Sequence, residues 1–319
     1  MGMLVEGRWQ DTDTSGFVRD GKQVRFTSGF HDWIKGDGSS EFIPEASRYA
    51  LYLNRTCPWS HRASVTRELK GLSHIIDEVL LEPAMGDQSW WFGNSSEYLD
   101  PAIGATHLHE LYSASDPAFT GRVSVPVLWD KKLKRIVNND SGALARMFNT
   151  ELNDLAEFPE VDFYPAALRP QLDVLNEFIG DRLNDGVYRC LLAKSQADYE
   201  IAFDRLFDAL DSLDEQLTSQ RYLLGPAPTE PDWRLFACLI RFDSIYYSLY
   251  KCNLRRIVDY PNLWDYTRDL YQIPGVARTV DMDRIKAGYY GIISRDGIVP
   301  KGPLLDLNAP HAREAWSRQ

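Results

Sequence analysis

The pattern of apolar and polar positions divides the chain into a β-rich first half and a helical second half. In the first half, two short apolar segments lie on either side of one amphipathic segment. This is the order of a β-α-β unit with two parallel strands. A hairpin and another helix follow. The elements predicted here are a strand over 48–54, a helix over 58–70, a strand over 74–82, a hairpin of 123–130 with 133–137, and a helix that starts at Asp140 or Ser141.

The second half has apolar residues at spacings of three and four, which predicts an all-α bundle. The helices expected from this period are 168–183, 196–217, 231–250 and 261–271. Before the third of them, the sequence Thr229-Glu-Pro-Asp232 fits a capping box with Pro231 in the first turn, which is a structural signal rather than a catalytic one. We therefore predict a thioredoxin-like α/β domain followed by an all-α domain, with the boundaries given next.

The predicted parts are an extended arm (1–46), an α/β domain (47–152) with an irregular insertion (83–122), a linker (153–166), a helical domain (167–291) and a tail (292–319) that wraps the surface. The arm has isolated aromatic residues that are expected to pack on the body of the protein: Trp9, Phe17, Phe26, Phe30 and Trp33. The insertion is longer than an inert connection usually is.

Composition excludes several classes of function. The 319 residues have a net charge of −11, from 35 basic and 46 acidic residues, which argues against nucleic acid or an anionic membrane as partner. We expect no membrane span and no secretory signal. The four cysteines match neither a disulfide framework nor a metal-ligand spacing, so we expect no metal site and a reducing, cytoplasmic location.

Cys57 is the strongest candidate for chemistry, because a predicted strand delivers it to the start of a helix that Pro58 opens. The positive end of a helix favours a thiolate and lowers the pKa of a cysteine there. Ser60 stands where a dithiol site would have its second cysteine, so internal disulfide exchange is not expected. A buried structural cysteine is the alternative, and the neighbouring His61 and Arg62 are equally compatible with solvated side chains.

Pro126 is a second marker in this domain. A proline at the start of a hairpin strand cannot donate a ladder hydrogen bond, so a simple edge position explains it. A cis Val125-Pro126 bond, as thioredoxin-like proteins have beside their thiol, is the functional interpretation, and the presence of Cys57 favours it.

Several long strings, in the right order, resemble the glutathione transferase superfamily and specifically its xi class, the glutathionyl-hydroquinone reductases. They are residues 57–62, 120–130, 138–141, 232–236, 241–246, 251–253, 285–291 and 297–303. The resemblance runs from the arm to about residue 305. It implies a homodimer that uses glutathione as co-substrate and reduces aromatic glutathionyl-hydroquinones, releasing the hydroquinone and glutathione disulfide. Cys57 would form a mixed disulfide with glutathione, which a second glutathione resolves.

The resemblance also implies a glutathione site. The γ-glutamyl carboxylate suits the helix start at Asp140-Ser141, while Val125 would pair with the cysteinyl backbone, Arg122 with the glycyl carboxylate, and Trp90 would form a wall. Without the family, a surface ion pair for Arg122 and core packing for Trp90 are the simpler explanations.

For the hydroquinone, matching positions select Tyr188, Tyr246 and Tyr289 from 16 tyrosines, to stack on the ring and exchange protons. Packing alone also explains the tyrosines on the helix of Tyr246. Family members usually carry Ala in place of Ser60 and a bulkier, often basic residue in place of Gly288, and Cys190 is also unusual.

Two other functions fit the same residues. An omega-like or glutaredoxin-like thiol transferase would share Cys57 and Ser141 without needing the tyrosines. A non-enzymatic binding module on the same scaffold would need none of them for turnover, because fold does not fix function.

Overall fold

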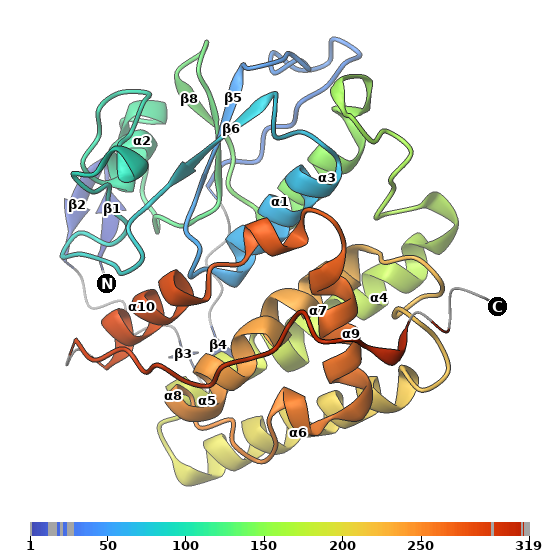
Figure 1. Ribbon diagram of the computed structural model, residues 1–319. Coiled ribbons are helices and arrows are strands. Elements are labelled where there is room, and N and C mark those ends of the chain that lie inside the picture. The colour runs from blue at the N-terminus through green and yellow to red at the C-terminus, as the bar shows by residue number, and fades with distance from the viewer. Residues whose placement is uncertain are drawn as a thin grey trace. The chain divides into compact units, whose positions relative to one another are not determined.

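The structure is a computed structural model that describes residues 2–11, 18–19, 22–23, 29–294, 297–313 and 315 (Figure 1). The strands are β1 (Met3–Val5), β2 (Arg8–Gln10), β3 (Val18–Arg19), β4 (Lys22–Gln23), β5 (Tyr49–Leu53), β6 (Ile76–Leu80), β7 (Val127–Asp130) and β8 (Arg135–Asn138). The helices are α1 (Pro58–Leu69), α2 (Leu108–Ser115), α3 (Ser141–Thr150), α4 (Arg169–Ile179), α5 (Gly186–Leu192), α6 (Gln196–Gln216), α7 (Glu230–Arg241), α8 (Tyr247–Leu249), α9 (Pro261–Gln272) and α10 (Met282–Ile293). Two π-helical segments, η5 (Gly180–Asn184) and η6 (Phe242–Tyr246), continue α4 and α7, and short 3-10 turns lie at η2 (Ser96–Tyr98), η3 (Asn153–Leu155), η4 (Ala166–Leu168), η7 (Ile257–Asp259) and η8 (Val276–Thr279).

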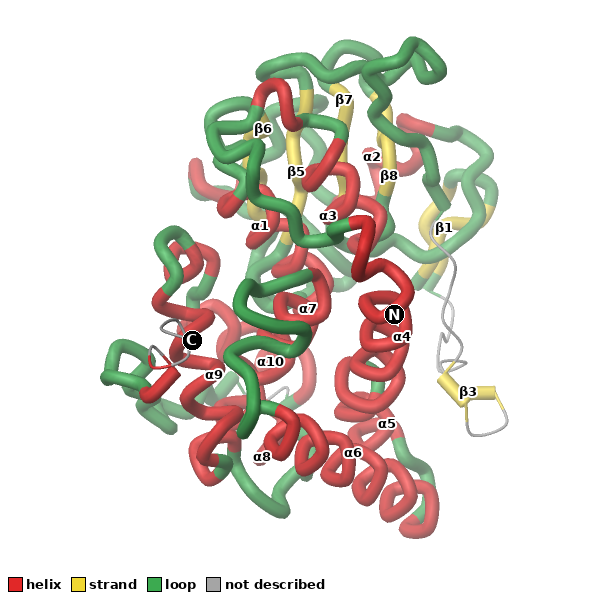
Figure 2. Tube along the Cα trace, turned by 90° about the vertical axis from the view of Figure 1, so that its right-hand side faces the viewer, coloured by secondary structure: helices red, strands yellow, loops and turns green. Residues whose placement is uncertain are grey.

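The chain forms two compact units. The first contains residues 1–161 and 281–298, and the second contains 162–280 and 299–319. The first unit therefore takes helix α10, which the sequence pattern placed in the helical domain. Figure 2, coloured by secondary structure, shows the strands β5 to β8 beside one another in the first unit, while helices and loops build the second.

A four-stranded sheet of order β6-β5-β7-β8 is the centre of the first unit. Strands β5 and β6 are parallel, as the predicted β-α-β unit requires, and β7 is antiparallel to both β5 and β8. Helices α1 and α3 lie on one side of the strands and α2 on the other (Figure 1). Alternate residues of β5 face the two sides, so all five are buried, which explains the apolar run in the sequence.

The N-terminal arm packs its described aromatic residues on this unit, as predicted. Trp9 and Phe30 contact the apolar cluster on the α2 side of the sheet, and Trp33 contacts the cluster on the other side. The hairpin of β1 and β2 joins the unit through paired backbone hydrogen bonds between Leu4 and Gly121, each 2.9 Å long. Phe17 and Phe26 lie outside the described residues.

The insertion 83–122 is less irregular than the sequence pattern indicated, because it contains α2. This helix has only eight residues, and the Glu110 carboxylate caps it by accepting a hydrogen bond of 2.8 Å from the His107 N–H. Its buried residues Leu108, Leu111 and Tyr112 cover the sheet. A helix this short gives a weak periodic signal, which is why the prediction missed it.

The second unit has the predicted helices at nearly the predicted positions. The capping box at the start of α7 is present: Asp232 accepts hydrogen bonds from the Thr229 N–H and hydroxyl, at 2.7 and 2.8 Å. The tail packs on this unit through Arg313, a buried residue that donates to the carbonyls of Leu217, Gln220 and Arg221.

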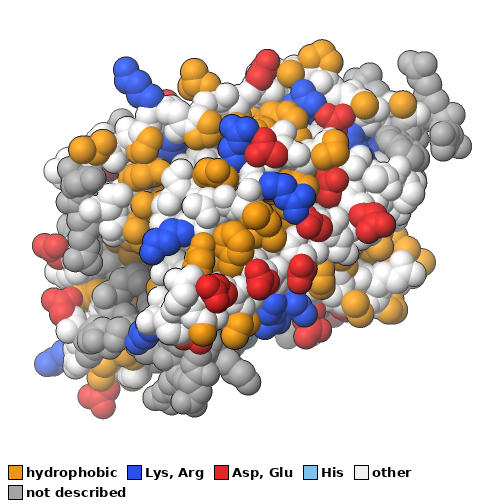
Figure 3. All heavy atoms as spheres, turned by 90° about the horizontal axis from the view of Figure 1, so that it is seen from below, with side chains coloured by type: hydrophobic (Ala, Val, Ile, Leu, Met, Phe, Trp, Pro, Cys, Tyr) orange, Lys and Arg blue, Asp and Glu red, His pale blue; other side chains and the backbone are white. Residues whose placement is uncertain are grey.

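The acidic residues are not gathered into one patch on the face seen in Figure 3, where carboxylates lie among basic and apolar side chains. Among the described residues, we find no helix long and apolar enough to cross a membrane.

Candidate active site

Cys57 is the N-cap residue of α1, as the sequence predicts, and its side chain is 8% exposed. Its sulfur accepts a hydrogen bond from the backbone N–H of Ser60 at 3.5 Å. The first turn of α1 has no acidic residue, so no negative charge on that turn opposes ionisation of the thiol. A thiolate here receives both a backbone donor and the positive end of the helix, which is the environment of a reactive cysteine.

Val125 lies beside this thiol. The Val125-Pro126 peptide bond is cis, as the functional interpretation of Pro126 predicted. The Cys57 sulfur is 3.7 Å from the Val125 carbonyl oxygen, to which the neutral thiol donates a hydrogen bond. The structure thus brings the Val125-Pro126 marker beside Cys57, although Cys57 and Val125 are 68 positions apart in the sequence.

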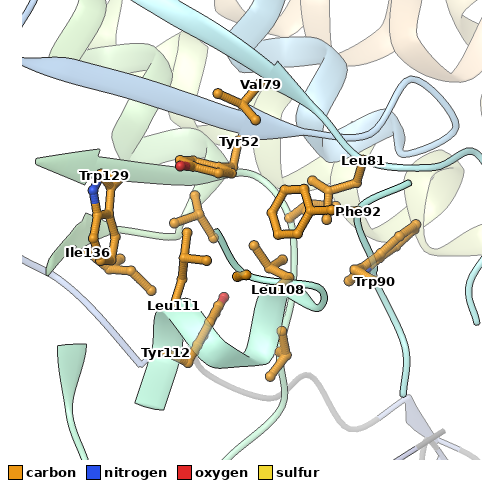
Figure 4. Close-up of a cluster of buried hydrophobic side chains, with 14 of the residues drawn as sticks. Tyr52, Val79, Leu81, Trp90, Phe92, Leu108, Leu111, Tyr112, Trp129 and Ile136 are labelled. Carbon is orange, nitrogen blue, oxygen red and sulfur yellow. The ribbon is translucent and has the colours of Figure 1, made fainter. Parts of the chain in front are cut away.

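Trp90 belongs to the same apolar cluster as Cys57 and Val125. Figure 4 shows it at one end of that cluster, next to Phe92, with Leu108 of α2 nearby. Its carbonyl accepts a hydrogen bond of 2.9 Å from the Leu108 N–H, which ties the insertion to the start of α2. Trp90 therefore packs in the core and lies in the cluster that contains the thiol, so the core-packing explanation and the predicted wall are compatible.

The start of α3 supplies the second group of candidate residues. Asp140 is the N-cap, and its exposed carboxylate accepts a hydrogen bond of 2.8 Å from the Ala143 N–H. Ser141, the first helical residue, is buried, and its hydroxyl accepts a hydrogen bond from the guanidinium of Arg62. A helix start that offers a hydroxyl and the positive end of the helix dipole is suited to an anion.

Arg62 is a residue to which the sequence analysis gave no role. Both His61 and Arg62 are buried, so the solvated alternative is wrong for this pair. Arg62 lies five residues after Cys57, on the part of α1 that faces α3 rather than solvent. The sequence does not reveal this position, because it depends on how the two helices pack against one another.

Arg122 lies three residues before Val125 and is half-buried. Burial lowers the pKa of its guanidinium to about 10, so the side chain is still cationic at neutral pH. A partly desolvated cation is well suited to a carboxylate ligand.

Tyr188 and Tyr246 come together in the second unit. Their ring centroids are 6.3 Å apart, and Tyr188 also packs edge-to-face on Tyr250 at 5.2 Å. Tyr188 is half-buried in α5, whereas Tyr246 is buried at the end of the π-helical segment η6. Segments of this kind occur frequently at functional sites, because the extra residue changes which side chains face a given direction.

Tyr289 lies on α10 and hence in the first unit, not in the helical one. Its neighbour Gly288 is closely packed in this unit: a Cβ atom there would lie 1.9 Å from the Thr56 hydroxyl oxygen and 2.5 Å from the Pro83 carbonyl oxygen. Thr56 donates hydrogen bonds to the carbonyls of Pro83 and Arg284, at 3.1 and 3.4 Å. The absence of a side chain at Gly288 thus lets α10 contact the residue that precedes Cys57.

Gly288→Ala is expected to destabilise the protein by about 1–3 kcal/mol and to lower turnover, since either α10 or the thiol loop must move to accept the methyl group. Gly291→Ala is the matched control on the same helix: it gains the same helix propensity, but its new methyl would meet only the Ala84 side chain, at 3.0 Å. Urea unfolding and steady-state turnover of both variants test this. Equal behaviour of the two variants would contradict it.

The other cysteines are Cys190, Cys238 and Cys252, all buried in the second unit, and none of the four forms a disulfide. Burial raises the pKa of the Cys238 thiol to about 12 and also raises that of the Cys252 thiol. Within the part of the chain that the structure describes, no group of three or more His, Cys, Asp or Glu could hold a metal ion.

Comparison with known proteins identifies both halves of the chain. The family model described as "Glutathione S-transferase, N-terminal domain" matches residues 56–151, and "Glutathione S-transferase, C-terminal domain" matches 196–269. The chain is similar to glutathionyl-hydroquinone reductase YqjG of Escherichia coli (strain K12), at 41% identity over 98% of this chain and 99% of that protein. Glutathione S-transferase omega-like 2 of Schizosaccharomyces pombe (strain 972 / ATCC 24843) is 37% identical over 90% of this chain and 95% of its own.

Solved structures of glutathione transferases are also similar to this chain. A xi class glutathione transferase from Natrialba magadii matches with a TM-score of 0.90 at 39% identity, covering 99% of this chain and 97% of that one. The glutathione-bound structure of YqjG from Escherichia coli K-12 has a TM-score of 0.88 and 39% identity, over 98% of this chain and 99% of that one. The similarity spans both units, so it includes every candidate residue above.

Proposed function

The chain belongs to the glutathione S-transferase family, in its xi class, and from this premise we propose that it is a glutathionyl-hydroquinone reductase that uses glutathione as reductant. The predicted family and fold are confirmed. The observation that carries the proposal is a single cysteine at the start of α1, with a backbone donor on its sulfur and Ser60 in place of a second thiol.

In the first step, the Cys57 thiolate attacks the sulfur of the glutathionyl group. The bond between that sulfur and the aromatic carbon breaks, and its electron pair goes to the ring carbon, which takes up a proton. The products are the free hydroquinone and a mixed disulfide between Cys57 and glutathione. A thiolate is required because it is the nucleophilic form of cysteine.

In the second step, the thiolate of another glutathione attacks the glutathione sulfur of the mixed disulfide. Glutathione disulfide leaves, and the Cys57 thiolate is regenerated. The two electrons that reduce the ring carbon thus come from two sulfur atoms, one from the glutathionyl sulfur of the substrate and one from the thiol of the second glutathione. Ser60 cannot perform this step, since a hydroxyl does not exchange with a disulfide.

The candidate residues of the first unit have complementary roles toward glutathione. We assign the γ-glutamyl ammonium to the Asp140 carboxylate and the γ-glutamyl carboxylate to the Ser141 hydroxyl and N–H. The Val125 backbone pairs with the cysteinyl unit, the Arg122 cation with the glycyl carboxylate, and Trp90 forms a wall. The burial of Arg122 and the contact between Cys57 and Val125 support this assignment.

We assign Tyr188, Tyr246 and Tyr289 to the hydroquinone. Their rings can stack on an aromatic substrate, and their hydroxyls can donate the proton that the ring carbon needs. The packing of Tyr188 on Tyr246 supports a shared role for these two. Gly288 and Cys190, which differ from the usual family pattern, are the residues from which we expect an altered preference among hydroquinones.

Turnover of glutathionyl-menadiol with glutathione tests the proposal. We expect equimolar release of menadiol and glutathione disulfide, with a glutathionylated Cys57 detectable by mass spectrometry when the second glutathione is withheld. If the folded protein released no menadiol in this assay, the proposal would be wrong.

A thiol transferase acting on disulfides is the second candidate, because the relative from Schizosaccharomyces pombe is named omega-like. It shares the Cys57 chemistry but not the need for tyrosines. Faster turnover of a glutathionylated disulfide than of glutathionyl-menadiol, unaffected by Tyr188→Phe or Tyr246→Phe, would favour it. The predicted homodimer and cytoplasmic location stay predictions.

Ser60→Cys is expected to divert the second step. The introduced thiol lies one helical turn from Cys57, and the replaced hydroxyl has no hydrogen-bond partner among the described residues, so no bond is lost. The new thiolate attacks the Cys57 sulfur of the mixed disulfide and expels glutathione, which leaves an intrachain disulfide. Mass spectrometry after one turnover should show this disulfide in Ser60→Cys and the glutathione adduct in Ser60→Ala. A persistent adduct in both variants would contradict the prediction.

A further inference from the structure

Arg62 links the thiol helix to the helix start that we assign to glutathione. It lies on α1, five residues after Cys57, and is 7% exposed. Its guanidinium donates a hydrogen bond to the hydroxyl of Ser141, which is 6% exposed at the first position of α3. The two helices pack on each other, with Ala63 and Leu144 in one apolar cluster, so the hydrogen bond joins two packed elements of the first unit.

The chemistry of the two groups fixes the direction of this hydrogen bond. A guanidinium has five N–H donors and no acceptor, so the Ser141 oxygen must accept. The hydroxyl has a single proton, and that proton is then available only for another partner. Arg62 thus holds Ser141 in the state in which it donates.

A cationic donor also strengthens the bond that the hydroxyl can make. Hydrogen bonds to charged groups are shorter and stronger than neutral ones, and a chain of them polarises each member. A carboxylate at the start of α3 would accept hydrogen bonds from the Ser141 hydroxyl and N–H, and it would lie near the positive charge of Arg62. A ligand group without negative charge would gain little from this arrangement.

We propose that Arg62 is a positioning residue for glutathione, which fixes the Ser141 hydroxyl as a donor to the γ-glutamyl carboxylate and thereby makes the protein select thiols that carry that group. This inference rests on the proposed function, since it deepens the assignment of Ser141. It predicts a role in recognition of the thiol and none in the reaction of the bound thiol.

The test is binding of S-methylglutathione, which cannot react, measured by calorimetry on the full chain. Arg62→Gln and Ser141→Ala should each raise Kd about tenfold, as expected for loss of one hydrogen bond to a charged group. In the double variant, Kd should stay within about twofold of Ser141→Ala, because Arg62 acts through that hydroxyl. Turnover of Arg62→Gln at saturating glutathione should stay close to that of the wild type.

Arg67→Gln is the matched control. Arg67 is also a buried arginine on α1, but it donates to the backbone carbonyls of Ile76 and Ser73, at 2.8 and 3.2 Å. Its loss should lower stability and leave Kd for S-methylglutathione unchanged. A mere structural role for Arg62 would make the two glutamine variants behave alike.

A second readout remains if Arg62→Gln does not fold. Arg62→Lys keeps the charge but not the planar fork, and should lose part of the preference for glutathione over the dipeptide Cys-Gly, which lacks the γ-glutamyl group. Two results would overturn this inference while leaving the proposed function intact. One is an unchanged preference for glutathione in Arg62→Lys. The other is an equal rise in Kd from Arg62→Gln whether residue 141 is Ser or Ala. Failure of the wild type to bind S-methylglutathione would instead overturn the proposed use of glutathione.

Discussion

Cys57→Ala is expected to abolish reduction of glutathionyl-menadiol, with kcat falling by about three orders of magnitude or more. The sulfur of Cys57 forms the covalent bond to glutathione in the proposed first step, and none of the other cysteines can replace it, because all three are buried in the second unit. Cys57→Ser should be equally inactive, since a hydroxyl at this position is not ionised at neutral pH. Release of menadiol is the quantity to measure.

Cys238→Ala is the control for this prediction. Burial raises the pKa of Cys238 to about 12, so it is a neutral thiol at neutral pH and should be dispensable for turnover. Cys57→Ala should still bind S-methylglutathione, because the donors at the start of α3 are intact. Substantial turnover by Cys57→Ala would show that the covalent mechanism is wrong, even if the overall reaction is correct.

Asp232→Ala is expected to produce the largest loss of stability, roughly 3–5 kcal/mol. The carboxylate is 0% exposed and accepts four hydrogen bonds: from the Thr229 N–H and hydroxyl, the Leu223 N–H at 3.0 Å and the Tyr266 hydroxyl at 2.8 Å. Alanine leaves these donors buried without an acceptor and removes the cap of α7. Urea unfolding followed by far-UV circular dichroism measures the effect.

Asp232→Asn has nearly the same shape and should be intermediate. The amide oxygen can still accept hydrogen bonds, but the amide nitrogen is a donor and would face groups that also donate. Only part of the four hydrogen bonds of Asp232 therefore survives. Thr229→Ser, which keeps the hydroxyl, should lie close to the wild type. A loss below about 1 kcal/mol for Asp232→Ala would contradict the argument that the network is tightly coupled.

Local chemistry made much of the fold predictable from the sequence. The alternation before Cys57 and the proline after it predict a strand that ends in a helix start, and the capping box of Thr229 and Asp232 marks the first turn of α7. Helix α2 escaped prediction, because a short helix inside a polar insertion depends on the sheet it covers for its stability.

The site was less predictable, because its residues meet only through tertiary packing. Nothing local to Arg62 indicates a partner 79 positions away, and Gly288 shows its role only when α10 lies on Thr56. Tyr188, Tyr246 and Tyr289 were selected from 16 tyrosines by resemblance alone, since their own surroundings in the sequence are typical of packed helices.

The contact of α10 with Thr56 has a consequence for the order in which the protein is made. Thr56 and Arg284 are 228 positions apart, so at about 5–20 residues per second a ribosome needs roughly 10–50 s to synthesise the second after the first. During that interval the nascent chain has its reactive cysteine without the helix that covers the neighbouring loop. The nucleophile is thus among the first functional groups to be synthesised, and its surroundings are completed only near the end of translation.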